Sequence, residues 1–175
     1  MRRRRVAAGC RAVGDYAARP QVLFGGVYGA VLASSMVAAL TRYGASSRSD
    51  RLYDTAWLLI TALASALAHG YAHLIARRGD QTHHGVLAAL RVLFEEWPLL
   101  VATAPTALLL LGAGLGWWAS DGVEYIAFTV NVVLLFTWGL LAARAGGRTW
   151  PSALRIGCGD ALLGVFVVVA NALIK

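Results

Sequence analysis

Residues 52–75 read LYDTAWLLITALASALAHGYAHLI, an apolar stretch with Asp54 near its start and two histidines, His69 and His73, near its end. A helix of about 20 apolar residues is long enough to cross the hydrocarbon core of a bilayer. This stretch therefore predicts a membrane-spanning helix, and stretches of similar length recur along the chain. Five spans are predicted, at about 22–40, 52–75, 98–118, 123–143 and 152–174.

The composition agrees with a membrane protein. Of the 175 residues, 58% are hydrophobic and 14% are charged, and the mean hydropathy is +0.61, outside the usual range of soluble domains. The predicted fold class is all-α, a polytopic membrane helix bundle. Residues 1–20 form a basic cytoplasmic arm, and residues 21–175 form a single five-helix transmembrane domain.

The segment between the second and third spans has its own pattern. From about residue 80 to residue 96, apolar residues recur at helical spacing against polar ones. Such a pattern predicts an amphipathic helix at the membrane surface. A cytoplasmic extension of the second span is the other interpretation.

The basic residues predict the orientation. With the N-terminus inside, the cytoplasmic segments hold twelve arginines and the outer segments four basic residues, which by the positive-inside rule places the N-terminus in the cytoplasm and the C-terminus outside. The N-terminal run Arg2, Arg3, Arg4 and Arg5 is predicted to bind anionic lipid. The net charge of +7 is explained by topology, so no nucleic-acid partner is expected. In this interpretation the protein is expected to lie in the plasma membrane.

Ionisable side chains inside a span are costly, so each calls for an explanation. His69 and His73, at i and i+4, share one helix face and could bind a metal ion or transfer protons. Glu95 and Glu96 stand at the cytoplasmic start of the third span. Depth from the helical rise places several polar residues in the same cytoplasmic half of the bilayer. The predicted pathway is formed by His69, His73, Glu95, Glu96 and Asp160, with Tyr28 and Arg155 lining it or forming ion pairs.

Each of these residues also has a simpler interpretation. The histidines would be an interfacial pair, and the two glutamates would be solvated residues at a helix N-terminus. Asp160 would pair with Arg155 or Arg144. Two asparagines are expected to form hydrogen bonds between helices rather than to bind a substrate, and an aspartate is expected to cap the outer start of the second span. These residues are Asn131, Asn171 and Asp54.

Small residues four apart favour close helix packing, within one monomer or between monomers. They are Gly25 with Gly29, Ala30 with Ser34, Ala64 with Ala68, and Gly112 with Gly116.

The sequence contains no recognisable catalytic motif. Nothing in the chain resembles a nucleophile elbow, a zinc-protease helix or a phosphate-binding glycine loop. We therefore expect no enzymatic activity.

The layout of the chain resembles the vacuolar iron transporter family. Residues 134–159, with a basic turn at Arg144, are similar to that family's fourth and fifth spans, and residues 24–29 and 68–71 stand where the family carries its first- and second-span motifs. The resemblance implies five spans, a cytoplasmic N-terminus and a dimer. Tyr28 stands in place of the family's aspartate and Gly70 in place of its glutamate, so the histidines would form a different site.

Two functions follow from these observations. The first is a dimeric transporter or channel for a cation, either a divalent metal ion or a proton, in which a metal ion would be the substrate; no cofactor is predicted. The second is a non-transporting scaffold or accessory subunit that binds lipid or a partner membrane protein.

Overall fold

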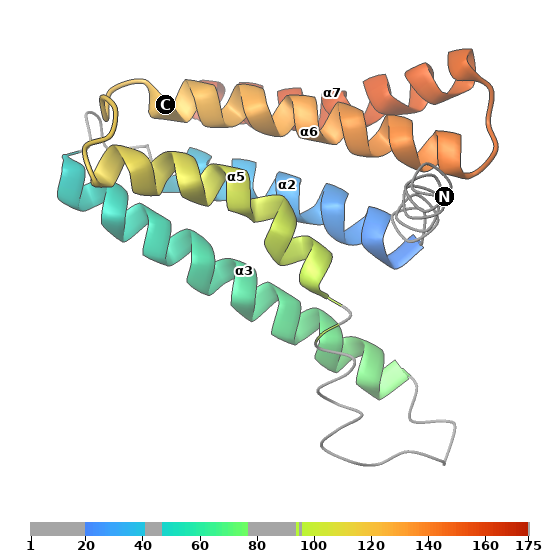
Figure 1. Cartoon of the computed structure of the whole chain (residues 1–175), viewed down its shortest axis with the longest axis horizontal. Coiled ribbons are helices and arrows are strands. Elements are labelled where there is room, and N and C mark those ends of the chain that lie inside the picture. The colour runs from blue at the N-terminus through green and yellow to red at the C-terminus, as the bar shows by residue number, and fades with distance from the viewer. Residues whose placement is uncertain (1–19, 41–46, 77–93, 95, 175) are drawn as a thin grey trace, which may run out of the picture.

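The computed structural model describes residues 20–40, 47–76, 94 and 96–174. The elements in this part of the chain are helices, and five of them are long and apolar enough to cross a membrane (Figure 1). For the described residues this confirms the predicted all-α fold with five helices of membrane-spanning length. The helices are α2 (Pro20–Leu40), α3 (Arg48–Ala76), α5 (Trp97–Gly114), α6 (Val123–Ala145) and α7 (Trp150–Ile174).

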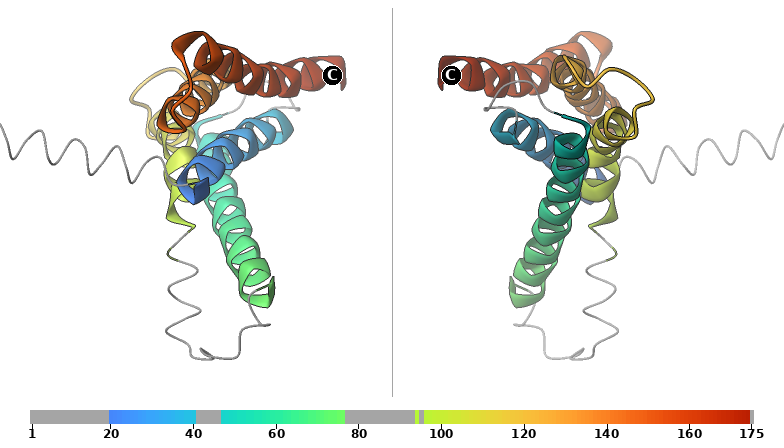
Figure 2. Two further views of the ribbon diagram at one scale, coloured as in Figure 1. Left: turned by 90° about the vertical axis from the view of Figure 1, so that its right-hand side faces the viewer. Right: turned by 90° about the vertical axis from the view of Figure 1, so that its left-hand side faces the viewer.

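Successive helices run in alternating directions, which gives the bundle two ends (Figure 1). We call them the α5–α6 end and the α6–α7 end, after the loop that each contains. α2 packs against all four other helices, and α6 pairs closely with α7. α3 packs chiefly against α5, with a smaller contact to α2. Figure 2 shows that α3 and α7 extend away from the central pair, α2 and α5, in different directions.

The hydrophobic core is rich in alanine and lies toward the α5–α6 end. Alanine allows helix backbones to approach closely, which is how helices gain contact area in a membrane. The core residues come from the second half of α2, the first half of α3, the second half of α5 and the first turns of α6. They are Ala33, Val37, Ala38, Leu58, Ala107, Leu110, Ala113, Val123, Ala127 and Phe128.

Gly25 and Gly29 bring α2 against the start of α5. A Cβ atom on Gly29 would lie 2.5 Å from the carbonyl oxygen of Leu99 and 2.8 Å from the Cβ of Ala102. A Cβ atom on Gly25 would lie 3.0 Å from the Cβ of Pro98. These contacts leave no room for a side chain, so this predicted small-residue pair packs within the monomer.

α3 begins one turn earlier than the predicted second span, and its cap differs from the expected one. The Ser47 hydroxyl accepts from the Asp50 backbone N–H at 3.3 Å, while the Asp50 carboxylate accepts from the Ser47 N–H at 2.8 Å. This reciprocal pair is a capping box. The prediction that Asp54 caps the helix is therefore wrong. Asp54 lies in the second turn and is buried.

The predicted third span ended at Trp118, whereas α5 ends at Gly114. Gly116 has a φ of 77°, and the Trp117 N–H donates to the carbonyl of Gly112 at 2.9 Å. This is the hydrogen-bond pattern of a helix that ends on a left-handed glycine. The chain then folds back, and the Trp118 indole N–H donates to the carbonyl of Leu109 at 3.1 Å. The predicted span was too long because Trp118 is apolar and continues the hydropathy pattern, although it lies beyond the end of the helix.

Candidate functional site

The two histidines of α3 lie at the α6–α7 end, where His69 contacts α2. Their ring centroids lie 5.5 Å apart, as expected for i and i+4 on one helix face. The His69 ring packs against two aromatic rings of α2, with centroid distances of 5.2 Å to Phe24 and 5.6 Å to Tyr28. The shared face predicted for the histidines is present, and aromatic side chains of α2 cover the ring of His69.

Glu96 reaches the histidines from α5. The residue directly precedes this helix, and its Oε1 lies 3.8 Å from Nε2 of His73. The separation is too long for a hydrogen bond, but a protonated imidazole at this distance would form an ion pair. The Glu96 side chain is 12% exposed and the His73 side chain 48% exposed. The pair is therefore exposed on the histidine side.

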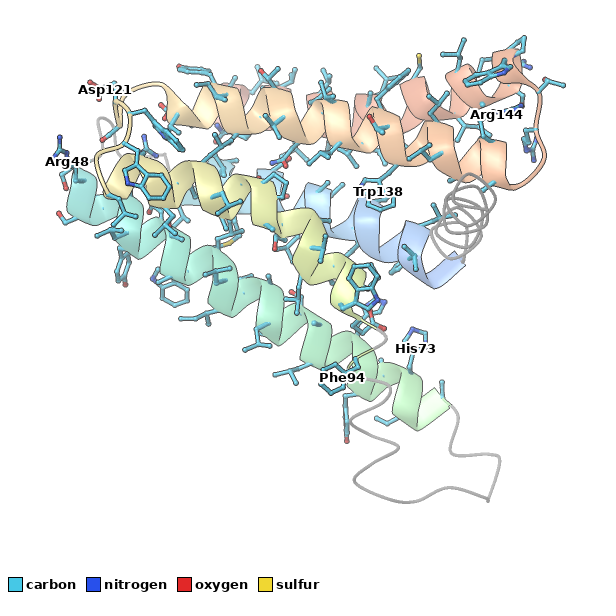
Figure 3. All side chains as sticks on the ribbon, in the orientation of Figure 1. Arg48, His73, Phe94, Asp121, Trp138 and Arg144 are labelled. Carbon is cyan, nitrogen blue, oxygen red and sulfur yellow. The ribbon has the colours of Figure 1, made fainter. Side chains whose placement is uncertain are left out.

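The structure thus brings together four predicted residues from three helices, namely Tyr28, His69, His73 and Glu96. In Figure 3, His73 and Phe94 lie at the end of the bundle opposite to Arg48 and Asp121. In the described part of the chain, no group of three His, Cys, Asp or Glu side chains is placed to hold a metal ion. The described geometry is an imidazole–carboxylate pair, with a second imidazole one helical turn away.

Asp160 does not join this group. Its carboxylate lies over Gly139, in the contact between α7 and α6, where a Cβ on Gly139 would clash with Oδ2. On α2, Gly26 packs against Trp138, the neighbour of Gly139, while Phe24 packs against His69. Positions 24 and 26 lie about 160° apart around a helix. The body of α2 therefore separates Asp160 from the histidines, although the sequence predicted all of them at a similar depth.

Arg155 is exposed, and its Nε donates to the carbonyl of Pro151 at 3.4 Å. Arg144 lies over the ring of Trp150, 4.5 Å from the centroid, and donates to the carbonyl of Arg148 at 2.7 Å. Among the described residues neither arginine forms an ion pair with Asp160. The simpler interpretation, in which Asp160 pairs with one of these arginines, is therefore not supported.

Several predicted residues lie outside the described part of the chain. These are Arg2, Arg3, Arg4, Arg5 and Glu95, together with most of the amphipathic segment 80–96.

Among the described residues, the most buried charges lie at the α5–α6 end. Arg51 directly precedes the predicted second span at 52–75, yet it is only 1% exposed. Its NH2 donates to Glu124 Oε2 at 2.7 Å and to the carbonyl of Ser120 at 3.0 Å. Asp54 Oδ2 lies 3.7 Å from Arg51 NH1. The i, i+3 spacing of Arg51 and Asp54 is visible in the sequence, but nothing local to either residue predicts Glu124 as a partner.

A second buried polar contact lies deeper in the bundle. The Thr106 hydroxyl of α5 donates to Oδ1 of Asn131 on α6 at 3.0 Å, and both residues are fully buried. The predicted interhelical role is therefore confirmed for Asn131.

No protein-family model, curated protein or solved structure matches this chain. The resemblance to the vacuolar iron transporters consequently depends on the residues of this sequence alone, and the site has to be interpreted from its own geometry.

Proposed function

We propose that this protein is an integral membrane transporter or channel for a cation, and that the cation is a proton. The observation that carries the proposal is the pair of Glu96 and His73, from α5 and α3, with His69 one turn further along α3. Imidazole changes its charge near neutral pH, and carboxylates are common partners in proton transfer. Intramembrane chains of such residues are a recurrent means of moving protons.

The proposed path starts at the exposed side of His73. In this path a proton enters at His73, whose Nε2 lies 3.8 Å from the carboxylate of Glu96. The next titratable ring is His69, whose centroid is 5.5 Å away, and Tyr28 lies beyond it with a hydroxyl that can donate and accept. Transfer between these rings requires ring rotation or an intervening water molecule, because the centroids are farther apart than a hydrogen bond reaches.

A divalent metal ion is the less favoured cation. Protein metal sites that bind ions such as zinc use three or four ligands, and the described residues at this end supply two imidazoles and one carboxylate that are not placed around a common point.

The proposal also covers the orientation of the protein, its membrane and its oligomeric state. We place the α6–α7 end in the cytoplasm, because exposed arginines cluster there, among them Arg144, Arg148 and Arg155. The protein would then lie in the plasma membrane with its C-terminus outside, and it would form a homodimer. The large apolar side chains exposed on α3, α6 and α7 are suited to lipid or to a second copy.

Proton flux into liposomes tests the proposal. Purified protein is reconstituted with a pH-sensitive dye inside the vesicles, and an imposed proton gradient is followed. We expect flux from the wild-type protein and its loss by at least tenfold in His73→Ala and Glu96→Gln. Tyr71→Phe is the matched control, because Tyr71 is an exposed residue of α3 two positions from His73. Flux that is equal in all variants would reject the site.

A scaffold or accessory subunit is the competing function. The observation that favours it is the outer surface of α7, which is the least buried of the five helices and displays large apolar side chains such as Phe166 and Leu173. Such a face fits a partner membrane protein as well as lipid. Absence of flux from the wild-type protein, with co-purification of a second membrane protein, would favour this function.

A further inference from the structure

The buried charges at the α5–α6 end do not balance. Arg51 and Asp54 are 1% and 6% exposed, and Glu124 completes the group with a side chain that is 20% exposed. One guanidinium therefore faces two carboxylates. With all three ionised, this buried group carries a net charge of −1.

The surrounding charged residues do not supply the missing positive charge. The guanidinium of Arg48 lies against Gly116, Asp50 is exposed and caps the start of α3, and Asp121 is exposed in the loop before α6. Of the charged residues that the structure describes around the group, Arg51 alone forms an ion pair with Asp54 or Glu124.

Some buried polar atoms of this group form hydrogen bonds and others do not. Arg51 NH2 makes the contacts to Glu124 and to Ser120, whereas its Nε and NH1 are buried without a hydrogen-bond partner. Asp54 Oδ2 is likewise buried without one. Arg51 thus donates its hydrogen bond to Glu124 on α6, and Asp54 is the carboxylate that lacks a full positive partner.

We propose that Asp54 is a proton-binding site of the folded protein. A buried carboxylate that lacks a full partner lowers its free energy by taking up a proton rather than by remaining charged. With the proton on Asp54, the group is neutral, and the Arg51–Glu124 pair joins the start of α3 to the start of α6. Loss of the proton gives Arg51 a second anionic partner on its own helix, which competes with Glu124.

The site is independent of the proposed proton pathway, because Arg51 and His69 lie roughly 27 Å apart along the axis of α3 at 1.5 Å per residue. A failure of the flux experiment would leave Asp54 untouched, and the reverse also holds.

Infrared spectroscopy of the purified protein in detergent at neutral pH tests the proposal. A protonated carboxylic acid has a carbonyl stretching band that a carboxylate lacks. We expect the band of Asp54 in the wild-type spectrum, its loss in Asp54→Asn, and its retention in Asp50→Asn, the matched control from the exposed cap of the same helix. A spectrum that Asp54→Asn leaves unchanged would overturn the proposal.

Thermal unfolding provides the second measurement. Asparagine has the shape of the protonated acid, so Asp54→Asn should unfold within a few degrees of the wild-type protein. Glu124→Gln should unfold at a clearly lower temperature, because it removes the carboxylate through which Arg51 joins α3 to α6, and Asp54 can offer a charge only from within α3. Failure of Asp54→Asn to fold, or a loss as large as that of Glu124→Gln, would also overturn the proposal.

Discussion

Arg51 is the largest fully buried side chain of the described chain. A single buried guanidinium is stable only when its charge is met by an anion and its N–H groups by acceptors. Glu124 supplies the anion at 2.7 Å, and the carbonyl of Ser120 accepts from the same terminal nitrogen at 3.0 Å, while the other two guanidinium nitrogens are buried without a hydrogen-bond partner. Because Ser120 and Glu124 flank the start of α6, this one side chain fixes the α5–α6 loop against the first turn of α3.

Removing the guanidinium should therefore destabilise the whole bundle. In Arg51→Met, Glu124 and Asp54 lose their common partner, and we expect a loss of about 3–5 kcal/mol in the free energy of unfolding. The measurement is reversible unfolding in mixed detergent micelles. Arg148→Met, at an exposed position, is the control, with an expected change within about 0.5 kcal/mol. Equal stability of the two variants would contradict the role given to Arg51.

Thr106 offers a test of the deeper polar contact. Thr106→Val keeps the shape of the side chain but removes the hydroxyl that donates to Asn131 at 3.0 Å. We expect a loss of about 1 kcal/mol, since hydrogen bonds between membrane helices contribute about 0.6 kcal/mol on average and up to about 1.7 kcal/mol. Thr129→Val is the control, because the Thr129 hydroxyl is exposed and donates within its own helix. Similar losses in both variants would count against an interhelical contribution.

The central element of the bundle is α2, which contacts every other helix. Different faces of α2 pack against different neighbouring helices. Gly25 and Gly29 admit the backbone of α5, and Gly26 admits the ring of Trp138 from α6. On the other side of α2, Phe24 and Tyr28 cover His69 of α3. The distribution of glycine and aromatic residues along one helix thus decides which neighbour packs where.

A methyl group on Gly29 should force α2 and α5 apart. Gly29→Ala would bring its Cβ to 2.5 Å from the Leu99 carbonyl oxygen, and overpacking of this kind costs about 1–3 kcal/mol. Gly159→Ala is the matched control, because a Cβ on Gly159 meets no atom within 4 Å, and alanine is the better helix former. We expect a lower unfolding temperature for the first variant alone; an unchanged temperature in Gly29→Ala would refute the close packing.

On the scale of the whole molecule, the two ends of the bundle differ in packing. The core lies toward the α5–α6 end, where Arg51 joins α3 to α6. At the α6–α7 end, α3 diverges from the other helices (Figure 1), and the contact between His73 and Glu96 is a loose one of 3.8 Å. A bundle that is fixed at one end and separated at the other is suited to local movement of α3 at the separated end.

The proposed orientation can be measured with cysteine labelling. Cys10 and Cys158 are replaced by serine, and single cysteines are placed at two exposed loop positions, Asp121 and Arg148. With the α6–α7 end in the cytoplasm, a membrane-impermeant thiol reagent added to intact cells should label Asp121→Cys and not Arg148→Cys. Both should be labelled after solubilisation in detergent. Labelling of Arg148→Cys alone in intact cells would reverse the topology.

The sequence by itself determined the five helices, because membrane-spanning length and apolarity are properties of a continuous stretch of chain. It also contained the capping box of α3 at Ser47 and Asp50 and the left-handed turn at Gly116, both of which depend on residues a few positions apart. The tertiary structure alone decided which polar groups meet. Arg51 finds Glu124 far along the chain, and α2 separates Asp160 from His69, because such contacts depend on how helices are rotated and packed, and depth along the membrane does not specify rotation.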